Sequence, residues 1–334
     1  PKIFLSEASP KSFASATNRR FPPRGEPLGM ESLELLTSEV LGCGTSGEVR
    51  LGRYTGSDRF VAVKVVTRGD PRCPLSPVPE SALEDEVVDH PNIVKVIERR
   101  LLNGEPVEVR ELCEGGELFD RIAEFGGLAD APEEAMAWFG QLCDAVAHCH
   151  RTGAVNGLLR AHHLLLDGSD RVRLLGFRRR WRQGRNDPTA RIALAHAAEQ
   201  LDAPELEGFS AGSFSDLARA DIWALGLLLV TLLIGEPPFA RARDDCAGYM
   251  ALKTGGLASA CPQLVRAVRR PRLALLDAML QTDPMRRPSA EEVRHRVSKW
   301  GSSSEEEEEK EESGGAAAPA AMSVDAPHLQ LPSA

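Results

Sequence analysis

The hydrophobic pattern of the chain changes at Gly115 and Gly116, and this change limits the folds that the sequence can adopt. Before the two glycines, short apolar runs alternate with turn residues, as in the strand, turn and strand pattern of residues 41–51 and the β-branched run of residues 60–66. After them, apolar residues recur at steps of three and four, which is typical of helices. Strands followed by helices predict an α+β fold with a small β-rich lobe and a larger α-helical lobe.

Two stretches of the second lobe carry the helical spacing most clearly, residues 136–147 and residues 222–233. Two short apolar runs, residues 164–166 and 172–175, interrupt the helical pattern. The turn sequence Asp-Gly-Ser-Asp at residues 167–170 lies between these runs, so it predicts a pair of short strands inside the helical lobe.

The 334 residues divide into three parts. Residues 1–32 are rich in Ser, Pro, Arg and Gly without periodicity and predict a disordered leader. Residues 33–300 form one body of enzyme size, with its N-lobe at about 33–110 and its C-lobe at about 114–300. Residues 301–334 contain eight acidic residues and one lysine, so this predicted disordered tail carries −7 of the formal net charge of −9.

Cysteine spacing, apolar run lengths and charge exclude several classes of protein. The seven cysteines include no C-x-x-C pair, so neither a disulfide framework nor a structural zinc site is expected. This pattern indicates a reducing compartment, the cytoplasm or the nucleus. The longest apolar run, Ala224–Ile234, is much shorter than the roughly 18 residues of a membrane span, so no membrane partner is expected. The body is nearly neutral, so no nucleic acid partner is expected either.

A glycine-rich segment near the start of the body gives the first chemical signal. Residues 42–49 read Gly-Cys-Gly-Thr-Ser-Gly-Glu-Val, a G-x-G-x-x-G-x-V pattern that also suits a plain β-hairpin. The residues after Gly47 alternate like a strand, whereas the dinucleotide-binding version of the pattern opens a helix. A glycine hairpin between two strands can lay its backbone N–H groups over phosphates.

Lys64 lies inside the apolar run of residues 60–66 and follows Gly47, the last glycine of the hairpin, by seventeen residues. A lysine inside an apolar strand is costly to bury alone, so it needs an anion or a carboxylate partner. The alternative is a lysine on the exposed face of an edge strand. Behind a glycine hairpin, the anion-binding interpretation is favoured.

Together with five further segments, the glycine hairpin and Lys64 resemble a protein kinase of the Ser/Thr group that includes calmodulin-dependent and checkpoint kinases. The resemblance extends to about residue 300, and its motifs follow the family's order. The five segments are residues 90–94 (HPNIV), 111–120 (ELCEGGELFD), 203–205 (APE), 221–226 (DIWALG) and 283–289 (DPMRRPS). The resemblance implies a bilobal protein kinase-like fold, ATP as the cofactor, and an ion pair between Glu205 and Arg287.

The resemblance also assigns residues to a nucleotide site, on the glycine hairpin, the lysine strand and the hinge between the lobes. The assigned residues are Leu41, Gly42, Gly44, Gly47, Val49, Ala62, Lys64, Glu84, Glu111, Cys113 and Glu117. Glu84 is the expected partner of Lys64 from the family's helix αC, with Glu80 and Glu86 as alternatives. Arg110 falls at the gatekeeper position, where a long cation crowds or polarises the adenine pocket.

The family's chemical groups are replaced at four positions. Leu158 stands where the catalytic Asp belongs, and leucine cannot accept the proton of a substrate hydroxyl. His163 and Gly176 stand at the two Mg²⁺-ligand positions, where oxygen ligands are preferred. Arg160 replaces the catalytic-loop Lys and keeps only its positive charge. No catalytic residue is therefore intact, and no metal ligand is expected.

These replacements beside an intact scaffold predict a pseudokinase, an inactive kinase homologue that serves as a signalling scaffold or an allosteric binding module. The retained glycines and Lys64 are compatible with ATP binding that is weak and independent of Mg²⁺. One alternative is an active Ser/Thr kinase in which a carboxylate such as Asp167 or Glu111 takes over catalysis. Another is a degenerate kinase copy whose fold is marginal.

The expected partners are other signalling proteins. The basic segment Arg178–Arg185 has two interpretations, a solvated loop or a docking site for an acidic partner or for the chain's own tail.

Overall fold

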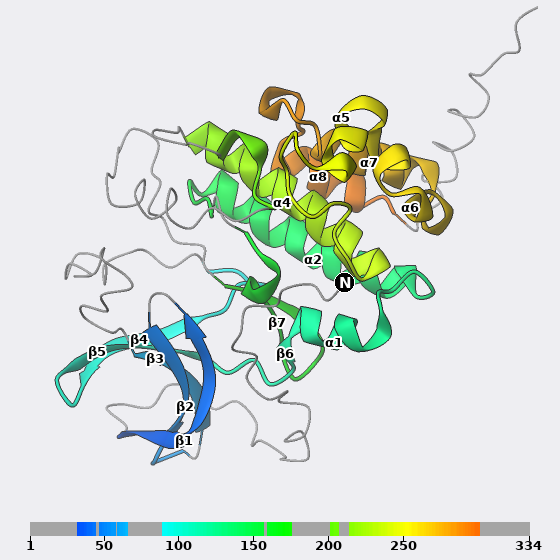
Figure 1. The fold of residues 1–334 in the computed structure, drawn as a ribbon. Coiled ribbons are helices and arrows are strands. Elements are labelled where there is room, and N and C mark those ends of the chain that lie inside the picture. The colour runs from blue at the N-terminus through cyan, green and yellow to red at the C-terminus, as the bar shows by residue number, and fades with distance from the viewer. Residues whose placement is uncertain are drawn as a thin grey trace, which may run out of the picture.

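The structure is a computed structural model that describes residues 32–44, 47–57, 59–65, 89–156, 159–175, 201–206 and 214–300. These residues form a β-sheet lobe followed by a helical lobe, which confirms the α+β prediction (Figure 1). The predicted leader and tail lie outside the described residues, apart from Ser32.

The N-lobe is a five-stranded antiparallel sheet in which the strands follow the order β1-β2-β3-β5-β4. The strands are β1 (Leu33–Gly44), β2 (Gly47–Tyr54), β3 (Arg59–Val65), β4 (Val96–Leu102) and β5 (Glu105–Glu111). Side chains alternate between the two faces of a strand, so one face of β3 and β5 is apolar and the other is charged. The apolar core of the lobe consists of Leu33, Tyr54, Val61, Val63, Val107 and Val109.

Strand β1 is longer than the sequence pattern predicts. The predicted strand starts at Leu41, whereas β1 starts at Leu33 and changes its register against β2 after Leu35 and again after Val40. Register changes of this kind break the alternation of apolar and polar residues on which a sequence-based prediction depends. The early part of the strand is therefore invisible to a search for period-two patterns.

The C-lobe surrounds a long central helix and carries a small sheet with strand order β6-β7-β8. Its helices are α1 (Leu118–Phe125), α2 (Pro132–Arg151), α4 (Phe214–Ile234), α5 (Ala247–Ala260), α6 (Pro262–Ala267), α7 (Arg270–Met279) and α8 (Ala290–Val297). The small strands are β6 (Gly116–Glu117), β7 (Leu164–Leu166) and β8 (Val172–Leu174), and the 3-10 turns are η3 (Ala161–His163), η4 (Pro204–Leu206) and η5 (Pro284–Arg286). The predicted helices and the predicted pair of short strands are confirmed.

Helix α4 is apolar over most of its length and runs through the centre of the C-lobe (Figure 1). By length and composition alone, its segment Ser215–Ile234 is apolar enough to cross a membrane, and 72% of its most apolar window is buried within the protein. Uninterrupted apolar runs do not predict this segment, because charged residues such as Asp216 and Asp221 divide it. A helix that is apolar on all sides is also what the core of a large lobe requires.

Asp221 of α4 connects two other segments to this central helix. Its carboxylate is fully buried, accepts the backbone N–H of Asn156 at 3.0 Å and lies 2.9 Å from Nε2 of His150. His150 belongs to the last turn of α2, and Asn156 begins the segment where the family's catalytic loop is expected. A buried carboxylate is tolerated only with such partners, so Asp221 fixes both segments against α4.

Arg287 forms the ion pair with Glu205 that the resemblance implies. Its guanidinium donates two hydrogen bonds to the Glu205 carboxylate, at 2.6 and 2.8 Å, and lies 5.0 Å from the centre of the Trp223 ring. The Arg287 side chain has no exposed surface. The pair therefore attaches η4, which follows the undescribed residues 176–200, to the core of the C-lobe.

Replacing Arg287 with Met should lower the free energy of unfolding by about 3–5 kcal/mol, because Glu205 then loses its partner inside the protein. Chemical denaturation of the two proteins measures the difference. Arg286→Met is the matched control, since Arg286 is the exposed neighbour, and this change should have almost no effect. Equal losses in the two variants would contradict the assignment.

Candidate functional site

The glycine segment forms the hairpin that connects β1 and β2. Gly42 pairs with Val49, and Gly44 pairs with Gly47, which has a φ of 131° that favours glycine. A side chain at Gly42 would meet nothing within 4 Å, so this glycine is not required by packing against the described residues. Its lack of a side chain is compatible with the close approach of a ligand to the backbone.

Lys64 lies on the charged face of β3, where it pairs in register with Glu108 of β5. Ala62, the neighbouring residue on that face, pairs with Arg110. Side chains directly opposite one another on adjacent strands have Cβ atoms about 4.5–5.5 Å apart. Lys64 and Ala62 therefore lie next to a carboxylate and a guanidinium, both on β5.

Glu108 is a buried carboxylate that the sequence analysis missed. It accepts hydrogen bonds from Nε of Arg99 at 2.8 Å and from Nε of Arg110 at 2.6 Å. Only 7% of its side chain is exposed, so the two guanidinium groups provide the charge compensation that burial requires. The sequence signal was a glutamate between two core valines, Val107 and Val109. Arg110 lies at the expected gatekeeper position, and its positive charge is offset by the Glu108 carboxylate.

Of the hinge residues, Glu111 is the last residue of β5 and Cys113 and Glu117 follow this strand; all three are half-buried. Oε1 of Glu111 accepts the backbone N–H of Lys95 at 3.0 Å. Burial, reinforced by the charge of Asp120, raises the pKa of Glu117, which directly precedes α1. The side chain of Glu111 is thus used for contacts within the protein.

Three of the expected site residues fall outside the described residues. They are Glu84, Leu158 and Gly176, and the basic segment Arg178–Arg185 lies outside them as well. Leu41 and Val49 are described, half-buried, and lie on β1 and β2 beside the glycines.

Arg160 and His163 are the two residues predicted for the catalytic loop that the structure describes. Nη2 of Arg160 lies 3.0 Å from the Asp202 carboxylate, just before η4. The positive charge at the catalytic-loop Lys position is therefore offset by a carboxylate of the same chain. The same contact joins the loop to the end of the activation segment expected from the resemblance.

His163 lies in η3, and its ring meets that of His162 edge-on at 4.5 Å. Burial lowers its pKa to about 3, and the positive charges of His162, Arg160, Lys64 and Arg110 contribute. The imidazole is therefore neutral at neutral pH, and its buried Nδ1 has no hydrogen-bond partner among the described residues. The charges of Lys64 and Arg110 in the N-lobe sheet thus act on the His163 imidazole in the C-lobe.

The residues at the described metal position do not fit Mg²⁺. This ion prefers oxygen ligands, whereas His163 offers a neutral imidazole among cations. No group of three or more His, Cys, Asp or Glu side chains suited to a metal ion is found in the ranges that the structure describes.

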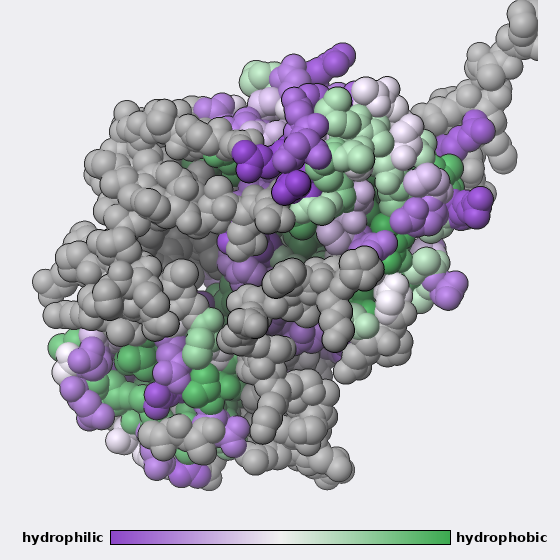
Figure 2. All heavy atoms as spheres, viewed as in Figure 1, coloured by the Kyte–Doolittle hydropathy of each residue, from purple (hydrophilic) through white to green (hydrophobic). Residues whose placement is uncertain are grey.

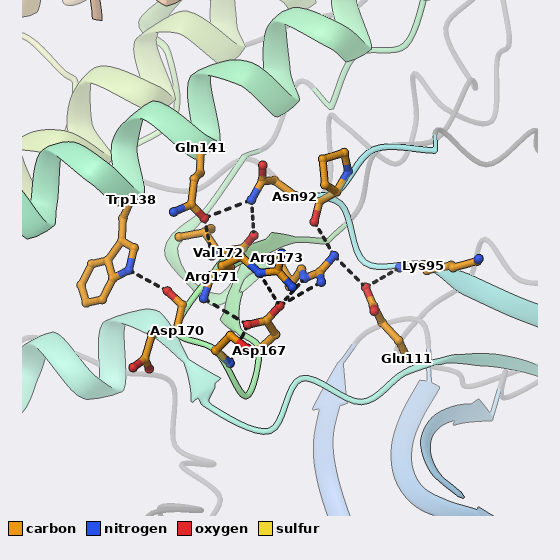
Figure 3. A network of polar contacts seen from close by, with 12 residues as sticks. Asn92, Lys95, Glu111, Trp138, Gln141, Asp167, Asp170, Arg171, Val172 and Arg173 are labelled. Carbon is orange, nitrogen blue, oxygen red and sulfur yellow. Dashed lines mark hydrogen bonds and ion pairs between the residues drawn. The ribbon is translucent and has the colours of Figure 1, made fainter. Parts of the chain in front are cut away.

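Arg173 of β8 is the centre of a polar network between the lobes (Figure 3). Its Nε and Nη2 donate to the Asp167 carboxylate at 3.1 and 2.8 Å, its Nη1 lies 3.5 Å from Oε1 of Glu111, and Nη1 also donates to the Pro91 carbonyl. Only 7% of the Arg173 side chain is exposed. One buried guanidinium therefore connects the β7–β8 turn, the hinge and the segment before β4.

Asp167 is held by several donors in this network. Its Oδ1 accepts the backbone N–H groups of Ser169 and Arg171 at 2.8 and 3.1 Å. Burial alone would raise the pKa of Asp167, but these hydrogen bonds and the Arg173 guanidinium outweigh it, so the pKa is lowered. A carboxylate stabilised in its charged form is a weak proton acceptor.

A second set of contacts fixes the residues beside this network. The side chain of Asn92 donates to the Val172 carbonyl and to Gln141 of α2, each at 3.0 Å, and Gln141 accepts the Val172 N–H at 2.8 Å. Ile93 pairs in parallel with Leu174. The segment before β4 is therefore attached to the C-lobe rather than to the N-lobe sheet alone.

Comparison with known proteins gives one family for almost the whole described body. Residues 35–298 match the family model described as the protein kinase domain. These bounds include every described candidate site residue.

Several curated relatives have similar sequences. The human SNF-related serine/threonine-protein kinase is 30% identical over 267 residues, covering 77% of this chain and 32% of that protein. CBL-interacting protein kinase 19 of Oryza sativa subsp. japonica is 31% identical over 292 residues, covering 86% of this chain and 54% of that protein. Carbon catabolite-derepressing protein kinase of Secale cereale is 30% identical over 266 residues, covering 77% and 49%. The chain thus spans a third to a half of the length of these relatives.

Replacing Arg173 with Gln should lower the free energy of unfolding by about 3 kcal/mol, because the buried carboxylate of Asp167 and the half-buried carboxylate of Glu111 lose their shared cation. Arg171→Gln is the control, since Arg171 contacts the same Asp167 at 3.3 Å but is 54% exposed, and its loss should stay below about 1 kcal/mol. Urea denaturation gives both values. A smaller loss for Arg173 than for Arg171 would contradict the assignment.

The neutral, buried His163 should make stability depend on pH. The ordinary pKa of histidine is 6.5, whereas the pKa of His163 in the folded protein is about 3. At pH values between these two, the unfolded state binds the proton and the folded state does not. Lowering the pH from about 7 to about 5 should therefore reduce the contribution of His163 to the free energy of unfolding by about 2 kcal/mol. His163→Leu should remove this part of the pH dependence, whereas the exposed His295→Gln should not. Denaturation curves at the two pH values test this, and identical pH slopes in wild type and His163→Leu would refute it.

Proposed function

The chain belongs to the protein kinase family, and from that premise we propose that it is a pseudokinase, a signalling scaffold or allosteric binding module without phosphoryl-transfer activity. The observation that carries the proposal is the replacement of the catalytic Asp and both Mg²⁺ ligands by Leu158, His163 and Gly176. Phosphoryl transfer depends almost entirely on positioning and charge neutralisation by such groups.

The retained scaffold supports a folded binding module over a degenerate, marginal copy. Asp221 is buried with partners from α2 and from the following loop, and the buried Arg287 binds Glu205 in a bidentate pair. These contacts hold the catalytic-loop region and the end of the activation segment in the same way whether or not chemistry takes place.

The remaining charges near the expected reaction centre are compensated within the chain. Arg160 is paired with Asp202, and Arg110 with Glu108. Cations engaged in this way are poorly available to stabilise a transferring phosphoryl group. This arrangement supports the inactive assignment independently of the sequence replacements.

The alternative, an active Ser/Thr kinase with relocated groups, needs a carboxylate that can act as a base. Asp167 and Glu111 were the sequence candidates, and both contact Arg173 in the network between the lobes. The lowered pKa of Asp167 further weakens it as a proton acceptor. The described contacts therefore favour the pseudokinase.

Protein kinase domains bind ATP as a family. For this chain we propose weak binding that does not require Mg²⁺, through the glycine hairpin and Lys64, because His163 is unsuited to hold the ion. We also propose intracellular signalling proteins as partners, in the cytoplasm or the nucleus. For Arg178–Arg185 the proposed occupant is an acidic partner, with the chain's own tail as the alternative.

A phosphoryl-transfer assay with radiolabelled ATP and generic protein substrates tests the main proposal. We expect no turnover above the level of a Lys64→Met control, with or without Mg²⁺, because each missing group accounts for several orders of magnitude in rate. Robust turnover that requires Mg²⁺ and disappears in Lys64→Met would establish the active alternative.

A thermal-shift titration with ATP separates binding from catalysis. Saturating ATP should raise the unfolding temperature equally in the presence of Mg²⁺ and of a chelator, and Lys64→Met should abolish the rise. A rise seen only with Mg²⁺ would refute metal-independent binding. No rise in either condition would refute ATP binding while leaving the inactive assignment intact.

A further inference from the structure

Three exposed arginines lie together at the junction of α6 and α7. Arg266 is in the last turn of α6, Arg269 precedes α7, and Arg270 is its first residue. We refer to Arg266, Arg269 and Arg270 as the α7 basic edge. In Figure 1, α6 and α7 lie at the end of the C-lobe away from the N-lobe sheet, and Figure 2 shows hydrophilic residues among more apolar ones in this part of the molecule.

The α7 basic edge has no acidic counterpart in the part of the chain that the structure describes. No salt bridge joins its arginines to a described carboxylate, although most other arginines of the C-lobe have one. The adjacent Arg272 is different, because it is buried, lies 4.0 Å from Glu133 and contributes to the core. Three exposed like charges within five residues repel one another and attract an anionic segment.

The described chain ends beside this edge. Trp300 stacks on Phe139 of α2 with ring centres 5.9 Å apart, and its ring centre lies 5.6 Å from the Arg272 guanidinium in the first turn of α7. The aromatic and cation contacts fix the position of Trp300. Whatever follows Trp300 therefore starts close to α7.

The segment that follows has the complementary charge. Residues 305–312 consist of seven glutamates and one lysine, a net charge of −6. The acidic run starts at Glu305, five residues after Trp300, and five residues reach at most roughly 17 Å. This span suffices to bring the first glutamates to the neighbouring end of α7. Basic surfaces farther from Trp300 are harder for them to reach.

We propose that residues 305–312 dock on the α7 basic edge of the same chain. The glutamates of the tail then neutralise the positive charges of the three arginines at this end of the C-lobe. The proposal names a site different from Arg178–Arg185, and it does not depend on whether the chain is a kinase or a pseudokinase. It relies on short tethering and charge, so high salt should release the tail.

The test uses the full-length chain and a fluorescein-labelled peptide of residues 301–313, with binding followed by fluorescence anisotropy. In the first protein variant, the seven glutamates of residues 305–312 are replaced by glutamine, so that its own tail cannot compete. The peptide should bind this neutral-tail variant at least about tenfold more tightly than the natural chain, because the natural tail occupies the site. Raising NaCl from about 0.05 M to about 0.5 M should abolish binding.

A second variant identifies the surface. Adding Arg266→Gln, Arg269→Gln and Arg270→Gln to the neutral-tail variant should weaken peptide binding about tenfold, as expected for three exposed charge pairs. The matched control replaces three other exposed arginines, Arg151, Arg171 and Arg286, by glutamine and should leave binding unchanged. Thermal unfolding of both triple variants verifies that they remain folded.

The remaining outcomes overturn the proposal. Equal binding to the natural and neutral-tail chains would mean that the tail does not occupy the peptide's site. No binding to either, or an equal loss in the control triple variant, would mean that the α7 basic edge is not recognised. A loss produced instead by glutamine replacements in Arg178–Arg185 would place the tail on the activation segment.

Discussion

The arrangement of the C-lobe depends on one fully buried carboxylate, that of Asp221 in α4. Water cannot solvate this charge, so its protein partners must, and they come from the end of α2 and from the loop that follows. The position of the loop is thereby determined by the central helix rather than by its own sequence. The start of the expected catalytic loop, at Asn156, is thus held in place by a contact that does not depend on the residues at the family's chemical positions.

Charge compensation within the chain is a common feature of the described residues near the expected nucleotide site. In an active kinase, basic side chains near the reaction centre contact the phosphates, and oxygen ligands such as carboxylates hold the metal ions. Here Glu108 pairs with Arg99 and Arg110, and Asp202 pairs with Arg160. These charges therefore have partners within the chain, and under the proposed pseudokinase function such contacts stabilise one protein conformation instead of a transition state.

Much of the fold could be predicted because it depends on local patterns. The glycine hairpin, helices α2 and α4, and the β7–β8 turn all follow from periodicity and turn residues, and the Glu205–Arg287 pair followed from the family resemblance. The Arg173 network and the Glu108 pairs could not be predicted in this way. They join residues from different strands and turns, so neither periodicity nor spacing identifies the partners. The first residues of β1 were missed for a different reason, because register shifts disturb the alternation that marks a strand.

The shared guanidinium of Arg173 also has a mechanical consequence. Opening the hinge pulls Glu111 away from the β7–β8 turn, and the cation must then leave one of its carboxylates in a place that water hardly reaches. Opening the hinge would therefore cost the free energy of separating a buried ion pair, a cost that is absent from a hinge without such a pair. Together with the contacts of Asn92 and Gln141, this side chain attaches the hinge and the segment before β4 to the C-lobe, so a substitution at position 173 would remove one of the two sets of contacts between them.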